Sequence, residues 1–145
     1  MKLIPALRCP EIMKTLSRIF FGLIFAVTAS ATDAASAKPA PVEVWCGGDD
    51  GLTLRLRDTL ESAFRLSPEF TVSSGKKPGT LIVTIPTHVK WKQIDRRTQV
   101  LYTVKFASTE NQNIGTSTGS CWGDALKKCA DHIVKDAKVA VRKIQ

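Results

Sequence analysis

The stretch Thr80-LIVTIPTHVKWKQIDRRTQVLYTVKFASTENQNIGTSTGSC-Trp122 decides the fold of this chain. It contains three runs rich in apolar, threonine and serine residues, at positions 80–91, 98–107 and 113–122, separated by short polar segments. Successive side chains of a strand point to opposite faces of the sheet, so alternating runs predict strands with one buried face. The stretch therefore predicts a three-stranded antiparallel meander.

Each run gives its own expectation about burial. In the first, the odd positions from Leu81 to Trp91 are mostly apolar and should face the core. The proline at position 86 has no N–H to donate to a neighbouring strand, so an edge or a bulge is expected there. In the second, Val100, Tyr102, Val104 and Phe106 should point inward. The third is rich in threonine and serine and contains two glycines, so we expect it to be the weakest strand.

Four further elements flank the meander. Residues 42–46 and 70–73 predict short strands, and residues 52–66 and 125–144 each carry an apolar stripe at helical spacing. An aspartate at 49 or 50 should cap the first helix, and Asp124 the second. The order is β-α-β-β-β-β-α, which predicts an α+β domain over 42–145: a mostly antiparallel five-stranded sheet with two helices packed on one face.

The N-terminal residues have the pattern of an export signal. Basic residues precede an apolar run at 19–27, and a small-x-small cleavage motif ends at Ala31. A membrane anchor is the alternative, but the run is about half of the roughly 20 residues that span a bilayer. We expect cleavage after Ala31, with a second small-x-small motif at 35–37, a flexible lead-in over 32–41, no membrane anchor afterwards, and a periplasmic or secreted product.

Charge and motifs restrict the possible functions. The whole chain carries a net charge of +8, and the predicted mature part +5, because the signal segment holds four bases and one acid. That is less than the dense positive charge of most nucleic-acid binders, so the charge does not favour nucleic acid as the partner. The two histidines, His88 on a predicted strand and His132 on a predicted helix, have no evident nucleophile beside them. We expect no enzyme activity, no metal and no small-molecule cofactor.

The predicted mature chain has three cysteines in a compartment that favours disulfides. Counting strand directions puts the end of the last strand, with Cys121, beside the start of the closing helix, with Cys129. We therefore expect a Cys121–Cys129 disulfide that joins helix to sheet. Cys46 is either a buried thiol or a point of pairing with another chain, and the oligomeric state stays open.

The best candidate for a binding surface is the hairpin tip formed by Lys90, Trp91, Lys92, Arg96 and Arg97. Bases interleaved with an aromatic residue suit an anionic partner: lipopolysaccharide, peptidoglycan, an acidic protein or single-stranded nucleic acid. The alternative is a solvated hairpin end whose charges discourage aggregation, with Trp91 turned toward the core.

The order of elements resembles that of small α+β domains of Gram-negative envelope proteins, such as the amino-terminal domain of the translocation protein TolB. The resemblance rests on the helix at 52–66, the strands at 80–85 and 100–106, and the closing helix. It implies an accessory role in an envelope assembly. We expect an exported, non-catalytic binding or accessory protein of the envelope or of host interaction, whose partner is a protein or an anionic envelope component. The alternative is a small inhibitor or immunity-type protein against an envelope-directed enzyme.

Overall fold

The computed structural model describes residues 38–75 and 77–144. The predicted signal peptide, residues 1–31, and most of the predicted lead-in lie outside the described residues. The lead-in prediction was wrong at its end, because Ala40 and Pro41 already belong to the first strand. None of the helices described is long and apolar enough to cross a membrane.

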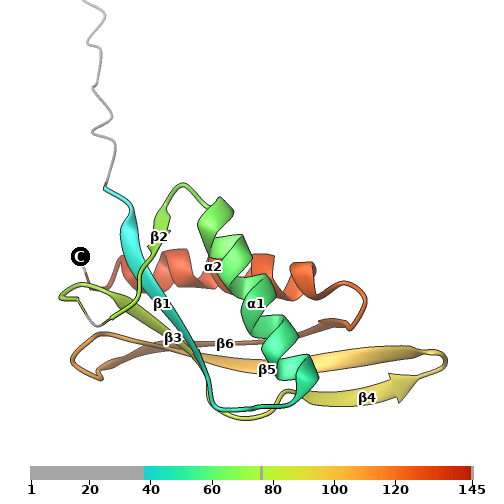
Figure 1. The fold of residues 1–145 in the computed structure, drawn as a ribbon. Helices are drawn as coiled ribbons and strands as arrows, with labels where there is room; N and C mark the ends of the chain where they lie inside the picture. Colours follow the sequence, from blue (N-terminus) through green and yellow to red (C-terminus); the bar gives the residue numbers. More distant parts are fainter. Residues whose placement is uncertain (1–37, 76, 145) are drawn as a thin grey trace, which may run out of the picture. The chain divides into compact units, whose positions relative to one another are not determined.

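The fold is α+β, as predicted (Figure 1). The elements follow in the order β1 (Ala40–Cys46), α1 (Gly51–Leu66), β2 (Phe70–Val72), β3 (Leu81–Ile85), β4 (Lys90–Ile94), β5 (Arg97–Ala107), β6 (Asn113–Trp122) and α2 (Leu126–Val141). The sheet has six strands where five were expected, because the first run of the meander is interrupted and forms two strands, β3 and β4.

The sheet is mixed. β1 pairs in parallel with β2 on one side and β3 on the other, whereas β3, β4 and β6 all pair antiparallel with β5. β3 and β4 share one edge of β5: Thr84 lies opposite Lys105, and Lys90 lies opposite Leu101. The other edge of β5 pairs with β6 along nearly its whole length, so the meander prediction is confirmed with one strand split.

The interruption between β3 and β4 falls at Pro86, where an edge or bulge was expected. The loop after β1 passes so close that a Cβ on Gly47 would lie 2.3 Å from the Pro86 carbonyl oxygen, which explains the glycine. Further along, the Val89 amide donates to the buried Thr53 hydroxyl of α1 at 2.9 Å. The link is therefore held by the β1–α1 loop and by α1.

Burial follows the predicted alternation, and both helices pack on one face of the sheet. The inward positions of the meander strands are almost completely buried: Leu81, Val83, Ile85, Val100, Tyr102, Val104 and Phe106. From α1, Leu56, Leu60 and Phe64 complete this core, together with the apolar stripe of α2. Phe64 meets Phe70 of β2 edge to face, with ring centroids 5.0 Å apart.

The two helices begin differently. Asp50 caps α1, because its Oδ1 accepts hydrogen bonds from the amides of Leu52 and Thr53, both at 3.0 Å. Its Oδ2 accepts from the Thr53 hydroxyl and lies 2.5 Å from His88 Nδ1. The prediction that Asp124 caps the closing helix was wrong: α2 starts after Ala125 without a side-chain cap.

Asp50 makes stability depend on pH. Hydrogen bonds, first from the Thr53 hydroxyl and amide and then from His88, hold the pKa of its carboxyl far below the usual value. A carboxyl whose pKa is lower in the folded than in the unfolded chain stabilises the fold above about pH 4, and this contribution is lost as the pH falls further. We expect Asp50→Asn to melt below the wild type at pH 7, with a gap that closes between pH 4 and 2.

Asp49→Asn is the matched control for this pH series. Asp49 is a fully exposed neighbour, 3.7 Å from His88 Nε2, that takes no part in the cap. Thermal melts of the control should follow the wild type at every pH. A gap of constant size for Asp50→Asn across the series would contradict the linkage.

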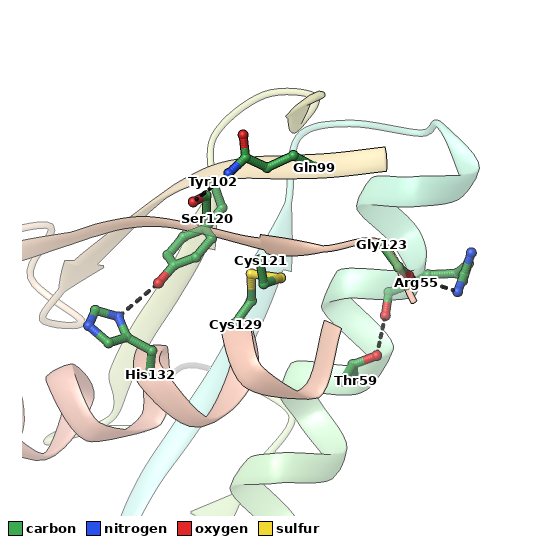
Figure 2. The surroundings of a disulfide bond; sticks show 9 residues. All are labelled: Arg55, Thr59, Gln99, Tyr102, Ser120, Cys121, Gly123, Cys129 and His132. Carbon is green, nitrogen blue, oxygen red and sulfur yellow. Dashed lines mark hydrogen bonds between the residues drawn. A yellow bond between two sulfur atoms is a disulfide. The ribbon is translucent and has the colours of Figure 1, made fainter. Parts of the chain in front are cut away.

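A disulfide joins Cys121 at the end of β6 to Cys129 in α2, the pair that the strand directions favoured. The Cα atoms are 5.6 Å apart, within the usual range for a disulfide. Figure 2 shows the bond connecting the strand directly to the helix drawn below it. Cys46 is a free, half-buried thiol on β1.

Candidate functional site

The predicted tip residues all lie on the hairpin formed by β4 and β5. Ile94 pairs with Arg97, so only Asp95 and Arg96 form the turn. Asp95 has φ 53°, in the left-handed region that aspartate tolerates better than most residues. In Figure 1 the hairpin (yellow to orange) reaches past the first turn of α1 and the start of α2.

Trp91 lies on the helix-facing side of the hairpin, as its position in the alternation predicts, opposite the buried Val100. The expectation that it is buried was wrong: its exposed fraction is 62%. Alternation sets only the face toward which a side chain points, and the helices do not cover this end of the sheet. The hairpin therefore presents a large aromatic side chain to solvent.

Lys90 and Lys92 extend from the opposite face of the hairpin. Both are exposed, and their cross-strand neighbours are Leu101 and Gln99. Since neither neighbour is charged, the pairing neutralises neither ammonium group. The hairpin thus carries positive charge on one face and an exposed indole on the other.

Arg97 differs from the other tip residues because it has a structural role. Its Nη2 donates to both carboxylate oxygens of Asp124, at 2.9 and 3.1 Å, and its guanidinium lies 4.4 Å from the ring centre of Trp122. Hydrogen bonding to Arg97 lowers the pKa of the Asp124 carboxyl. Asp124, which was expected to cap α2, instead forms this ion pair.

A groove of about 580 Å³ opens between the hairpin and the start of α1, on the helix-facing side. Its lining includes Leu52, Arg55, Trp91, Arg96, Arg97 and Asp124. Arg55 comes from the first turns of α1 and was not among the predicted site residues. Its position on the polar face of a helix gives no signal that it lies near the hairpin.

A second polar cluster, which the sequence did not reveal, lies between β5, β6 and α2. Tyr102 Oη is 2.8 Å from His132 Nδ1, and the Ser117 hydroxyl donates to Asp136 Oδ2 at 2.6 Å (Figure 2 shows the tyrosine pointing at the histidine). Burial raises the pKa of Tyr102. Serine, histidine and aspartate are the residue types of a hydrolytic triad, but here the serine is 1% exposed and bonded to the aspartate. The cluster joins sheet to helix.

Gly119 makes room for this cluster. A Cβ at Gly119 would lie 2.6 Å from Tyr102 Oη and 2.9 Å from its ring. We expect Gly119→Ala to lower the free energy of unfolding by about 1–3 kcal/mol, the usual cost of overpacking. Gly115→Ala is the control in the same strand, because its new methyl group would make an ordinary contact at 3.9 Å with Phe106. Equal urea midpoints for the two variants would contradict the close approach.

His88 was expected on a strand and instead lies in the link between β3 and β4. Its ring is exposed and bonded to Asp50, whose other side-chain hydrogen-bond partner, the Thr53 hydroxyl, belongs to a fully buried residue. A hollow of about 440 Å³ lies beside it, lined by residues of the link, β5 and β6. Over residues 38–75 and 77–144 there is no group of three or more His, Cys, Asp or Glu side chains that could hold a metal ion.

Comparison with known proteins gives fold-level likenesses only. No protein-family model matches the chain, and no curated protein matches it at a significant level. A PelC dodecamer structure from Paraburkholderia phytofirmans has a TM-score of 0.47 and 12% identity, over 72% of this chain and 88% of that one. A minor lipoprotein from Acinetobacter baumannii has a TM-score of 0.41 and 10% identity, over 70% of this chain and 94% of that one. Likenesses at this level say nothing about function, and the resemblance to TolB stays a prediction.

Proposed function

We propose that this chain is an exported binding protein without catalytic activity, which holds an anionic partner through the β4–β5 hairpin. The observation that carries the proposal is that one short hairpin exposes Trp91 on its helix-facing side, Lys90 and Lys92 on its opposite face, and Arg96 at its turn. Within the residues that the structure describes, none of these three bases takes part in an ion pair. Tryptophan and arginine are the residue types that most often dominate binding energy at protein surfaces.

Two further features support the proposal. The disulfide between Cys121 and Cys129 suits an oxidising compartment, in keeping with the predicted export signal. Near each histidine, one buried hydroxyl is bonded to an aspartate: Thr53 to Asp50 beside His88, and Ser117 to Asp136 beside His132. A buried, bonded hydroxyl is poorly placed to attack a substrate, which favours binding over catalysis.

The proposal is tested by charge reversal on the hairpin. Arg97 is left unchanged, because removing it would break its ion pair with Asp124. We expect Lys90→Glu, Lys92→Glu and Arg96→Glu together to weaken binding of the envelope partner at least tenfold and to flatten the dependence of its affinity on salt. The partner is first captured by crosslinking in the native envelope, and its affinity is then measured with purified proteins.

The control carries the same charge change elsewhere, at the exposed positions Lys128, Lys135 and Arg142 on and just after α2. It should keep wild-type affinity. If the hairpin variant binds as tightly as this control, the hairpin is a solvated end of the sheet and the proposal fails. A captured hydrolase whose activity falls on binding would assign the inhibitor role.

A further inference from the structure

The groove behind the hairpin brings together three separate segments of the chain. Trp91 and Arg96 come from the hairpin, Leu52 and Arg55 from the start of α1, and Asp124 from the link before α2. Trp91 gives the groove an aromatic wall and Leu52 adds a half-buried apolar side chain. The groove therefore offers apolar contact and guanidinium groups within one hollow.

Of the three arginines that line the groove, one forms an ion pair and two form none with the described residues. Arg97 and Asp124 neutralise each other through their ion pair. Arg55 donates only to the Gly123 carbonyl, at 3.5 Å, a distance at which a hydrogen bond is weak (Figure 2). Within residues 38–75 and 77–144, neither Arg55 nor Arg96 forms an ion pair. Two guanidinium groups are thus available in a groove with an exposed indole.

Two guanidinium groups beside an exposed indole indicate what kind of ligand the groove would bind. A guanidinium group holds a carboxylate through two parallel hydrogen bonds, and an indole face packs against apolar or aromatic side chains. One exposed carboxylate that forms no ion pair within the described part of the chain, Asp95 at the turn, interrupts the positive surface beside Arg96. A polyanion with closely spaced charges, such as a nucleic acid, would meet this carboxylate, whereas a peptide can place its acidic and apolar side chains separately.

We propose that the groove binds an acidic segment of a partner protein, with carboxylates on Arg55 and Arg96 and a neighbouring apolar side chain on Trp91. This inference rests on the proposed function and names the kind of partner that the hairpin meets. It also adds a residue outside the hairpin, Arg55, to the binding surface.

The test is a titration followed by the indole N–H signals of the ¹⁵N-labelled protein recovered from the periplasm of expressing cells. The probe is the peptide acetyl-Gly-Asp-Phe-Asp-Gly-amide, and its neutral twin carries asparagine in place of both aspartates. The chain has three tryptophans, and Trp45 on β1, which does not line the groove, serves as the internal control. We expect the acidic peptide to shift the Trp91 signal in a saturable way and to leave the Trp45 signal nearly unchanged.

Arg55→Gln should weaken binding of the acidic peptide roughly tenfold, because it removes one charge-assisted contact. Arg65→Gln, on the exposed last turn of α1, is the matched control and should bind like the wild type. Equal affinity of Arg55→Gln and wild type, a Trp91 signal that does not move, or an equal response to the neutral peptide would each overturn the groove proposal. A single-stranded DNA oligomer that shifts Trp91 at a lower concentration than the peptide would assign the groove to a polyanion instead.

The two proposals fail separately. If the envelope partner still depends on Lys90 and Lys92 while Arg55→Gln binds it normally, the hairpin function stands and the groove proposal falls. If neither variant changes partner affinity, both fall.

Discussion

Replacing Phe64 with alanine is expected to lower the free energy of unfolding by about 3–5 kcal/mol. The side chain is fully buried in α1, between the sheet and the rest of the helical layer, and packs edge to face on Phe70. Its removal forfeits the transfer free energy of the ring and leaves a cavity that its neighbours fill only in part. Because the free energy of unfolding of such a domain is about 5–15 kcal/mol, the variant should retain only part of that stability.

Urea unfolding followed by tryptophan fluorescence measures this loss. Leu66→Ala is the control from the same helix: its side chain is 79% exposed, so the urea midpoint should stay close to that of the wild type. Phe64→Leu keeps most of the apolar volume and provides a folded reference if the alanine variant does not accumulate. A Phe64→Ala midpoint equal to that of Leu66→Ala would show that α1 does not pack on the sheet as described.

Removing the disulfide should have the next largest effect. Cys121 and Cys129 are eight positions apart, and closing so short a loop restricts the unfolded chain by an amount worth about 2.5 kcal/mol. We expect Cys121→Ala with Cys129→Ala to lower the melting temperature by roughly 10 °C. Alanine is chosen because both sulfur atoms belong to the buried core, where a serine hydroxyl would lack a partner.

Cys46→Ala is the matched control, since this thiol is free and only half-buried. Its melting temperature should change far less than that of the double variant. Melting the wild-type protein with a reductant should reproduce most of the loss seen in the double variant. A double variant that melts with the wild type would mean that the two thiols are not bonded in the exported protein.

Much of the fold follows from local patterns in the sequence. Alternation along the second run predicted the buried set from Val100 to Phe106, and helical spacing predicted the buried stripe of α1. The direction of successive strands was enough to choose Cys121 and Cys129 as partners. These features depend on periodicity and on the order of elements, both of which can be read directly from the sequence.

The candidate site was only partly predictable, because it depends on where elements end in space. Alternation gave the face of Trp91 but not its exposure, which follows from where α1 begins relative to the hairpin. Arg97 was expected to be an unpaired cation at the tip, and Asp124 was expected to cap a helix, but the two form an ion pair. The contact between Tyr102 and His132 required both the register of the strands and the path of α2.

The gap between β3 and β4 has a mechanical consequence for the hairpin. A hairpin attached only through the link at 86–89 could swing on that link. Beside the gap, however, β5 and β6 run on without interruption and stay paired, Tyr102 with Gly119 and Thr103 with Thr118. The arm is therefore stiff against bending in the sheet, and Cys121, which pairs with Val100 between the tip and the gap, also ties this part of the arm covalently to α2. Amide hydrogen exchange would register this as slow exchange in β5 beside faster exchange at Thr87 and His88 of the link, whereas the Val89 amide is protected by its bond to Thr53.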